Sequence, residues 1–396
     1  VRYFLMDKKA KGVNTICTHI GELEDKTFKG AISPLYMSTS YDYEDVDIKR
    51  YPRYFNTPNQ EALCRKIAAL EHTEGALIFG SGMAAVSTAL LAFLNKGDHL
   101  VVPRQIYGGA YNLIVEEFPK YGIEYTFIDS TERKAFEDAI QPKTRVLYLE
   151  TPSNPLLTLT DLDSIGSLGR SYGLTTLIDN TFASPVNQNP ADFGIDIMIH
   201  SATKYMGGHS DICAGAVAGS HEHIDRIFQL AKNLGGSLSD YTVWLLERSL
   251  KTMGIRVRAQ NENALKLANF LDQHPDIENV YYPGLESHPN HQIAKAQMHG
   301  FGGLLSFELS ESLDQPTFMR SLQWIKVSMS LAGVESTLLS PTQTSHALLS
   351  PEERLKAGIR DGLIRFSTGI EDFEDLKADL TQALMQSKTL TKASVT

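Results

Sequence analysis

Cysteine, long apolar runs and clusters of basic residues are all scarce in this sequence of 396 residues. The three cysteines, Cys17, Cys64 and Cys213, lie far apart and form no C-x-x-C pair. This spacing argues against a disulfide framework and fits a reducing compartment. The longest apolar run, at 84–94, is too short to cross a bilayer, and no signal peptide is evident. We therefore expect a cytoplasmic location and no membrane partner.

The charge pattern excludes a further class of partner. The formal net charge is −10, and the sequence contains no Lys/Arg-rich tract. Nucleic acids and anionic membranes require basic clusters, so we expect neither as a partner. There is no internal repeat or low-complexity segment, and the length suits two packed domains. We predict an extended arm at 1–57, a first domain at 58–250 and a second domain at 251–396.

The predicted arm is rich in Tyr, Ser and Pro and has little regular periodicity. A helix is predicted immediately after it, where "TPNQEALCRKIAALE" begins at residue 57. Thr57 is the expected N-cap, Pro58 takes the first helical position, and Gln60 completes a capping box.

Short apolar runs alternate with helical patterns through the first predicted domain. Near-continuous Val/Ile/Leu strands that alternate with helices predict an α/β fold with a mostly parallel sheet covered on both faces. The expected strands are 76–79, 99–102, 124–128, 145–150, 175–179, 195–200 and 214–219.

A long helical stretch at about 240–273 leads into the second, smaller α/β domain. Its expected strands are 278–283, 304–310, 324–330 and 363–369, followed by a last helix at about 371–386. In open α/β sheets, ligands bind beyond the carboxyl ends of the strands. Polar residues stand at those ends in the first domain: Ser81, Asn154, Asp179 and 201–204.

Two of these positions have both a functional and a structural interpretation. A helix start just after Gly80-Ser81-Gly82 offers free N–H groups to an anion, although the motif is neither G-x-G-x-x-G nor Walker A. The alternative is an ordinary glycine turn. Asp179 ends an apolar strand, where a buried carboxylate needs a cation or a strong donor. The alternative is that Asp179 or Asn180 caps a helix.

Lys204 follows another apolar strand, where a lysine is rarely placed without a partner. Ser201 and Lys204 also fit the S-x-x-K nucleophile motif, but the S-D-N and K-T-G elements that accompany it are missing. A solvated loop lysine is the other alternative. Pyridoxal phosphate (PLP) requires three groups from a protein: an amine for its aldehyde, an anion site for its phosphate and an acid for its ring nitrogen. Lys204, the helix start at Gly82 and Asp179 could supply them.

Several segments make this interpretation specific, and they occur in order along nearly the whole chain from about residue 12. With them, the sequence resembles the Cys/Met-metabolism family of PLP-dependent enzymes. The segments are "IYGGA" (106–110), "ETPSNP" (150–155), "IDNTF" (178–182), "SATKYMGGHSD" (201–211), "YYPGLESHPNH" (281–291) and "RFSTGIED" (365–372).

The resemblance implies the type I, aspartate aminotransferase-like PLP fold and a role for each matching residue. It implies that Lys204 binds the cofactor covalently and moves protons. Asp179 is expected to pair with the ring nitrogen, and Tyr107 to stack on the ring as a candidate general acid or base. Other expected cofactor-binding residues, the last four at the phosphate, are Ser81, Gly82, Met83, Ser201 and Thr203.

The substrate and the neighbouring subunit are also implied by the resemblance. Arg365 is expected to bind the substrate carboxylate as a bidentate fork, with Asn154 and Ser330 beside it. Tyr51 and Arg53 resemble the family's Y-x-R segment, which reaches the phosphate of a neighbouring subunit in a homotetramer. The family's G-N-P-T follows that arginine, whereas this chain has Asn56-Thr57-Pro58 with the proline displaced by one residue.

Three further positions bear on the substrate. Tyr54, Asn112 and Met329 stand where members that use cystathionine often carry charged residues. Leaving the distal amine and carboxylate of cystathionine unpaired costs roughly 1–3 kcal/mol each, which favours a thioether or a homoserine ester. Conversely, the methionine γ-lyase pattern has a cysteine at Gly109, while "AGVES" (332–336) and "TSHA" (344–347) are similar to cystathionine γ-synthase and γ-lyase.

We therefore expect γ-elimination or γ-replacement at sulfur amino acids, of the cystathionine γ-synthase or γ-lyase type. The alternatives are methionine γ-lyase, cystathionine β-lyase or O-acetylhomoserine sulfhydrylase activity, and a non-catalytic binding module of the same fold. The H-x-x-H spacing of His288 and His291 lacks nearby carboxylates or cysteines, and 221–223 is expected to start a helix. We therefore expect no metal site.

Overall fold

The computed structural model describes residues 12–344, 351–356 and 358–388, and these form two compact units. The first unit comprises the described residues up to Pro152, Leu159–Ile255 and Gln297–His299. The second comprises Ser153–Thr158, Arg256–Ala296 and the described residues from Gly300 onward. Two segments named above lie outside the described residues: 1–11 of the predicted arm and 345–347 of "TSHA".

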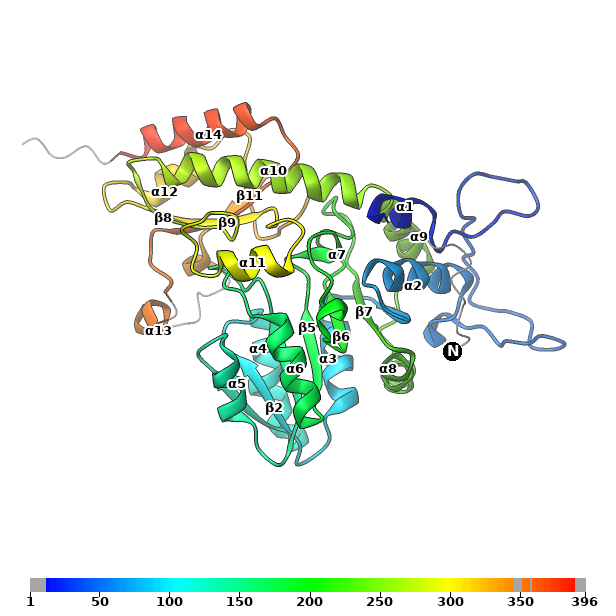
Figure 1. The fold of residues 1–396 in the computed structure, drawn as a ribbon. Helices are drawn as coiled ribbons and strands as arrows, with labels where there is room; N and C mark the ends of the chain where they lie inside the picture. The colour runs from blue at the N-terminus through cyan, green and yellow to red at the C-terminus, as the bar shows by residue number, and fades with distance from the viewer. Residues whose placement is uncertain (1–11, 345–350, 357, 389–396) are drawn as a thin grey trace, which may run out of the picture. The chain divides into compact units, whose positions relative to one another are not determined.

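A seven-stranded sheet forms the centre of the first unit, in the order β1-β7-β6-β5-β4-β2-β3 (Figure 1). Only β7 runs antiparallel to its neighbours, so the sheet is mostly parallel as expected. The strands are β1 (Gly75–Phe79), β2 (His99–Pro103), β3 (Glu124–Ile128), β4 (Thr144–Glu150), β5 (Thr175–Asp179), β6 (Ile197–His200) and β7 (Gly215–Gly219).

All seven expected strands are present, although β6 begins two residues later than predicted. Their apolar composition follows from their position, because β2, β6 and β7 are buried along their whole length between two helical layers. Gly215 opens β7 where a Cβ atom would lie 2.1 Å from the Ser81 carbonyl oxygen. The glycine therefore lets β7 pass against the backbone before α3.

Helices cover both faces of this sheet. One face packs on α3, α4 and α8 in a continuous apolar core, and the other is covered by α2, α5 and α6. The helices of the unit are α1 (Val13–His19), α2 (Pro58–Leu70), α3 (Gly82–Phe93), α4 (Gly108–Asn112), α5 (Arg133–Ala139), α6 (Leu162–Tyr172), α7 (Ser184–Asn187), α8 (His221–Leu234) and α9 (Asp240–Leu250).

The predicted capping of α2 is confirmed. The Thr57 side chain accepts from the Gln60 N–H, the Gln60 side chain accepts from the Thr57 N–H, and Pro58 takes the first position. The displaced proline thus begins a regular helix. The start of α8 at His221 is confirmed as well.

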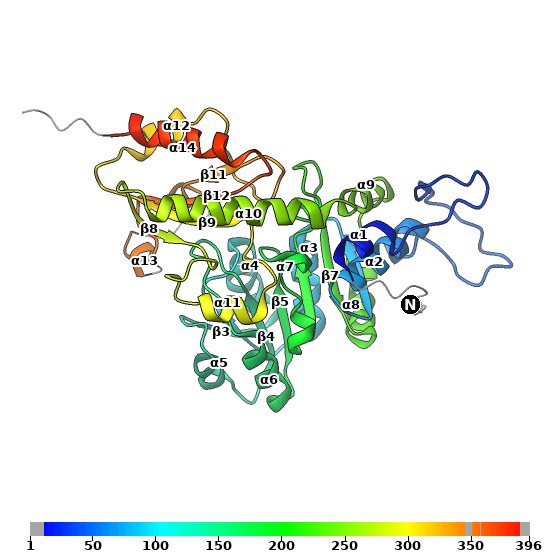
Figure 2. The same cartoon turned by 45° about the horizontal axis from the view of Figure 1, so that its top comes forward.

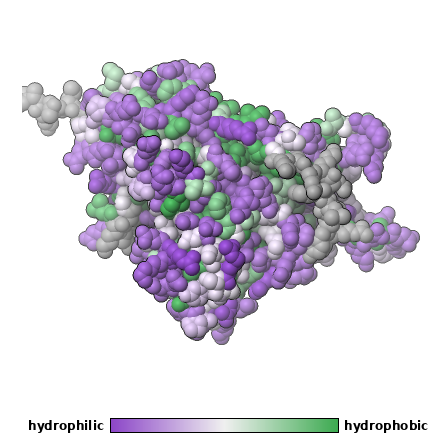
Figure 3. Space-filling model, in the orientation of Figure 1, coloured by the Kyte–Doolittle hydropathy of each residue, from purple (hydrophilic) through white to green (hydrophobic). Residues whose placement is uncertain are grey.

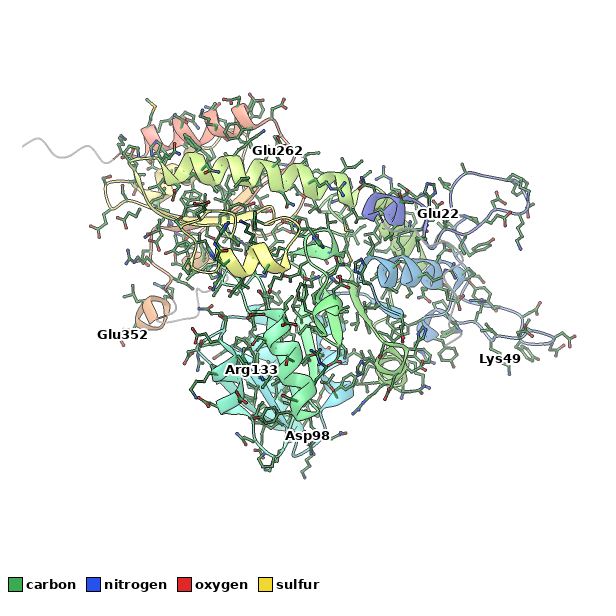
Figure 4. All side chains as sticks on the ribbon, in the orientation of Figure 1. Glu22, Lys49, Asp98, Arg133, Glu262 and Glu352 are labelled. Atoms are coloured by element: carbon green, nitrogen blue, oxygen red, sulfur yellow. The ribbon has the colours of Figure 1, made fainter. Side chains whose placement is uncertain are left out.

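The residues before α2 are fixed mainly by hydrogen bonds. The Ser33 hydroxyl donates to Glu247 at 2.8 Å, and the Trp244 indole donates to the Ser33 carbonyl at 2.9 Å, so this part of the arm is held by α9. Glu22, which Figure 4 shows close to α1, forms an ion pair with Lys251. Between these contacts and η1, a 3₁₀ turn at Pro52–Tyr54, the arm forms extended loops.

The second unit has a five-stranded sheet in the order β10-β11-β12-β9-β8, which is antiparallel except for the β10–β11 pair. Apolar residues of α10, α12 and α14 pack on it in one core (Figure 2). The elements are β8 (Ile277–Tyr281), β9 (Leu304–Leu309), β10 (Lys326–Val327), β11 (Thr337–Leu339), β12 (Leu363–Ser367), α10 (Met253–Asp272), α11 (His291–Gln297), α12 (Gln315–Ser321), α13 (Pro351–Lys356) and α14 (Phe373–Gln386).

Three predictions for this part of the chain need correction. The helical stretch at 240–273 is two helices, because the chain breaks between Leu250 and Met253. The strand expected at 324–330 is reduced to β10, since Trp324 and Met329 are exposed and bury no side of a strand. The strand β11 was not predicted at all.

The surface gives no sign of a membrane span. Hydrophilic residues cover most of the face that Figure 3 presents. Within residues 12–344, 351–356 and 358–388, no helix has the length and apolar character needed to cross a bilayer.

Candidate active site

The carboxyl ends of β4, β5 and β6 bring the predicted cofactor residues of the first unit to one edge of the sheet. Asp179 ends β5, where it pairs in register with Glu150 of β4 and with Ile199 of β6. His200 ends β6, and the segment that contains Ser201 and Lys204 follows it directly. Parallel strands in adjacent register place these residues at the same edge, as the sequence predicted.

The Asp179 carboxylate is only 8% exposed. Its Oδ1 accepts a hydrogen bond from the Thr181 N–H at 3.0 Å, and the Thr181 hydroxyl accepts one from the Ser201 N–H at 2.8 Å. Burial raises the pKa of Asp179, whereas the Thr181 hydrogen bonds and the charge of His200 act to lower this pKa. The helix-cap alternative is wrong, because the N-cap of the next helix, α7, is Ala183.

The segment that contains Lys204 is fixed by backbone hydrogen bonds at both ends. The Thr203 hydroxyl accepts from the Ala214 N–H at 3.0 Å, and the Lys204 N–H donates to the Ser201 carbonyl at 3.0 Å. The Gly208 N–H in turn donates to the Lys204 carbonyl at 2.7 Å. Lys204 is half-buried rather than fully solvated. Ser201 does not begin a helix, which removes the structural context of the S-x-x-K alternative.

The start of α3 lies against this segment. Ser81 is the N-cap, and its Oγ accepts from the Ala84 N–H at 3.1 Å. A Cβ atom on Gly82 would lie 2.9 Å from Ser201 Cβ, so glycine is required where the two segments meet. Free N–H groups of the first turn and the Ser201 hydroxyl therefore gather in one region, while the Thr203 hydroxyl bonds to the Ala214 backbone.

Tyr107 and Met83 meet at Gly109. A Cβ atom on Gly109 would lie 2.6 Å from Tyr107 Cε1 and 3.0 Å from Met83 Sδ. The Tyr107 side chain is 52% exposed, but its backbone N–H donates to Glu150 Oε2 at 2.7 Å. Tyr107 is thus positioned through its main chain at the edge where Asp179 lies.

Glu150 and Thr181 are site residues that the sequence analysis missed. Glu150 is 5% exposed and ends an apolar strand, which is the same signal that identified Asp179. Thr181 lies within "IDNTF" and joins the ends of β5 and β6 through its hydroxyl. A polar residue at or just after a strand end was the available signal in both cases.

Tyr51, Arg53 and Tyr54 lie together on the arm. The Arg53 guanidinium lies 5.0 Å from the Tyr54 ring centroid and 5.7 Å from that of Tyr51, and it donates to the Lys232 carbonyl at 2.6 Å. Phe55 adopts a left-handed conformation with φ of 55°, and the Asn56 side chain accepts from the Tyr51 N–H. This turn accommodates the displaced proline.

The expected substrate residues of the second unit also meet. Arg365, on β12, donates from Nη1 to Asn154 Oδ1 at 3.1 Å and from Nη2 to the Ser330 carbonyl at 3.2 Å. Arg365 is 7% exposed and Asn154 6%. Met329, next to Ser330, is 71% exposed.

The three positions expected to select the substrate do not line one cavity of the first unit. Tyr54 lines a cavity of about 420 Å³ with residues of α2, β1 and α8, and Asn112 on α4 is not among its lining residues. Met329 belongs to the second unit. In the described part of the chain, no three His, Cys, Asp or Glu side chains are grouped to hold a metal ion.

These residues fit PLP. A lysine, a buried acid and a helix N-terminus with space left by Gly82 occur at one sheet edge. Arg365, with two oxygen partners on one side, has the planar donors that a carboxylate requires.

Comparisons with known proteins agree with this chemistry. The chain is 40% identical over 374 residues to a cystathionine γ-lyase of Bacillus subtilis, with 93% of this chain and 98% of that protein covered. It is 40% identical over 362 residues to a cystathionine β-lyase of the same organism, with 90% and 92% covered. The crystal structure of cystathionine γ-lyase from Lactobacillus plantarum complexed with L-serine matches with a TM-score of 0.91 and 38% identity, covering 95% of this chain and 99% of that one.

The family model described as Cys/Met metabolism PLP-dependent enzyme matches residues 14–385. The predictions of the α/β fold class, of PLP as the cofactor and of an enzyme acting on sulfur amino acids are confirmed. The chain therefore belongs to the Cys/Met-metabolism family of PLP-dependent enzymes.

Proposed function

We propose that this enzyme catalyses γ-elimination or γ-replacement at sulfur amino acids, of the cystathionine γ-lyase or γ-synthase type. The observation that carries the proposal is the presence of two prepared sites in the chain, one in each unit. One is the sheet edge with Lys204 and Asp179, and the other is Arg365 with Asn154. The first suits PLP, and the second suits the α-carboxylate of an amino-acid substrate.

In this proposal Lys204 would bind the cofactor and then remove first the α-proton and later a β-proton of the substrate, and loss of the β-proton expels the leaving group from the γ-carbon. Asp179, buried and oriented by Thr181, pairs with the ring nitrogen. PLP, when bound, supplies the electron sink that acidifies the α-proton. Tyr107 covers the ring and is the candidate acid or base. The phosphate is bound by the first turn of α3, with Ser81, Gly82 and Met83, and by Ser201 and Thr203.

Arg365 binds the α-carboxylate in this scheme. Its hydrogen bonds to Asn154 and to the Ser330 carbonyl fix the guanidinium plane before substrate arrives. Little side-chain entropy is then lost on binding, and the two-pronged contact orients the α-carbon.

The distal part of the substrate is expected to meet Tyr54, Asn112 and Met329, which carry no charge. This favours tolerance of a thioether or an ester beside cystathionine. Gly109 weighs against the methionine γ-lyase pattern, because a cysteine there would have its Cβ only 2.6 Å from the Tyr107 ring. Methionine γ-lyase, cystathionine β-lyase and O-acetylhomoserine sulfhydrylase activities are the alternatives to this proposal.

The proposal includes a homo-oligomer, formed as a dimer of dimers, with the Tyr51–Arg53 segment entering a neighbour's site. Exposed apolar side chains along the arm support an oligomer, because a group of apolar side chains exposed to water is typical of a surface that binds another protein. They are Phe28, Ile32, Met37, Tyr43 and Val46. A cytoplasmic location is also proposed, supported by three free cysteines.

A substrate panel tests the reaction. The purified enzyme with PLP is supplied with cystathionine, methionine, cysteine, or O-acetyl- or O-succinylhomoserine plus cysteine. The measured products are 2-oxobutyrate, pyruvate and cystathionine. Release of 2-oxobutyrate from cystathionine, or synthesis of cystathionine from an ester, supports the proposal. Pyruvate as the main product from cystathionine would replace it with β-elimination.

A further inference from the structure

A second set of buried polar residues lies behind the sheet edge and has no part in the scheme above. Glu71, the C-cap of α2, has no exposed surface, and His200 is 2% exposed. His200 Nε2 forms a short contact with Glu71 Oε1, and Asn180 Nδ2 donates to the same oxygen at 3.1 Å. The two residues that contact Glu71 are thus the immediate neighbours of Asp179 and Ser201.

The arrangement follows from strand geometry. Successive side chains of a strand point to opposite faces, so Asn180 and His200 point away from the face on which Asp179 lies. The Asn180 N–H donates to the Ile199 carbonyl at 2.9 Å, which joins β5 to β6 exactly one residue beyond Asp179. Glu71 therefore contacts the ends of β5 and β6 from the face of the sheet opposite to Asp179.

The surrounding contacts make this network rigid. Gln188 donates to Asn180 Oδ1 at 3.0 Å and to the Thr151 carbonyl at 3.2 Å, and Gln297 donates to Gln188 at 3.1 Å. A carboxylate without exposed surface is unfavourable unless a cation or strong donors compensate for its lost hydration. Glu71 Oε2 has no partner among the described residues, so the compensation comes from His200 and Asn180 at Oε1.

We propose that Glu71 and His200 form a positioning pair that sets the place and the electrostatic surroundings of the Asp179 carboxylate from the opposite face of the sheet. This inference rests on the proposed role of Asp179 at the ring nitrogen. Neither residue of the pair touches the cofactor in this arrangement. They act by fixing the ends of β5 and β6, and by holding the imidazole against the Glu71 carboxylate behind Asp179.

The charge of His200 favours the ionised form of Asp179, against the burial that raises the pKa of this carboxyl. The other ionisable groups near Asp179 are Tyr148 and Glu150 on β4, and Lys204 after β6. Burial, together with the charges of Asp179 and Glu150, raises the pKa of Tyr148, so this phenol stays neutral. On β4 the Asp179 carboxylate thus meets a neutral phenol and another acid, and His200 on β6 is the neighbour whose electrostatic interaction lowers the pKa of Asp179.

The test compares two cofactors rather than activities. PLP and its 1-deaza analogue, which has C–H in place of the ring nitrogen, are titrated into the cofactor-free full-length enzyme. The ratio of their dissociation constants reports the contact at the ring nitrogen alone. Glu71→Gln retains the shape and an acceptor oxygen but removes the carboxylate, and His200→Gln removes the imidazole. Each should reduce the preference for PLP by roughly five- to tenfold.

His99→Gln is the matched control. His99 is also buried in this sheet, with hydroxyl partners Thr144 and Thr126 at 2.9 Å, but it begins β2 rather than ending a strand. We expect this variant to leave the ratio unchanged. Glu71→Gln/His200→Gln should lower the ratio no further than either single change, because the two residues act as a unit.

Each other outcome is decisive. Equal weakening of both cofactors, with an unchanged ratio, would mean that the pair only supports the fold and would overturn the inference. A similar fall in His99→Gln would do the same. Asp179→Asn separates this failure from failure of the proposed function. If that variant keeps the full preference for PLP, the assignment of Asp179 itself is wrong.

Discussion

Two groups of site residues differ in how this chain holds them. Asp179 and Arg365 are less than a tenth exposed, and each has protein hydrogen-bond partners with defined geometry. Tyr107 and Met329 are more than half exposed. The buried group would make contacts that every substrate shares. In the exposed group, Tyr107 would cover the cofactor ring and Met329 would meet the distal part of the substrate. A single chain thus holds the buried side chains in a defined geometry, whereas the exposed side chains are held in place only by whatever packs against them.

The largest expected effect is at the reactive amine. Lys204→Ala should lower kcat for cystathionine by roughly 10³-fold or more, because both covalent binding and proton transfer are lost. After borohydride reduction and dialysis, the wild-type protein should carry a pyridoxyl group at Lys204, located by mass spectrometry. Lys134→Ala, at an exposed helical lysine, is the control. Retained activity with a pyridoxyl group on another lysine would refute the assignment.

Asp179→Asn should keep some cofactor yet lose turnover by about 10²–10³-fold, the usual scale for removing a charge partner of a reacting group. The raised pKa of Asp179 also makes a stability prediction. An acid whose pKa is higher in the folded than in the unfolded state binds its proton more tightly in the folded state. Its contribution to the stability of the cofactor-free fold is therefore present at low pH and is lost as the pH rises through the folded-state pKa.

At pH 7 the cofactor-free Asp179→Asn protein should therefore melt at a higher temperature than the wild type, with the difference disappearing at pH 4. Calorimetry at the two pH values measures this. A lower melting temperature at pH 7 would show that the carboxylate is stabilised by its partners rather than penalised by burial.

Arg365→Lys tests the buried group in the second unit. A lysine keeps the charge but cannot contact a carboxylate with two parallel donors while also bonding Asn154 and Ser330. We expect kcat/KM for cystathionine to fall about 10–100-fold, mostly through KM. Cofactor affinity should be unchanged, which provides the internal control. A fall in kcat alone would contradict a binding role.

Arg53→Ala tests whether a neighbouring chain completes the cofactor site. Cofactor retention should weaken, and a mixture refolded with Lys204→Ala should recover roughly a quarter of wild-type activity, since one site of each mixed dimer has both residues intact. Lys204→Ala mixed with Asp179→Asn is the control, because both changes fall within one chain's own site and should not complement. An active monomer in sedimentation would end the proposal of a shared site.

The effect expected at Met329 is on substrate preference rather than on overall activity. Met329→Glu supplies an acceptor for the distal ammonium of cystathionine, while methionine packs better against a methyl thioether. One charge-assisted bond is worth about 1.5–3 kcal/mol. The ratio of kcat/KM for cystathionine to that for methionine should rise accordingly, and Met385→Glu, at another exposed methionine, should leave it unchanged. An unchanged ratio in Met329→Glu would mean that this side chain does not face the substrate.

The sequence predicted the first unit closely because its strands are short, apolar and bounded by polar ends. The same reasoning overlooked β11, since three residues between polar neighbours carry no periodicity. It also joined α9 to α10, because neither glycine nor proline marks residues 251–252. Glu150 and Thr181 were passed over because their role depends on strand register, which no single segment contains.

The Tyr107 main-chain N–H donates a hydrogen bond to Glu150 Oε2, so the backbone of residue 107 is anchored without use of its phenol. The position of residue 107 is therefore independent of its side chain. Residue 107 can therefore be substituted more freely than Lys204 or Asp179. Phenylalanine, histidine or a non-natural aromatic residue can be introduced there while the backbone hydrogen bond to Glu150 is kept. Variants at this solvent-facing ring would therefore test the proposed role of Tyr107 while the hydrogen bond that anchors its backbone is kept.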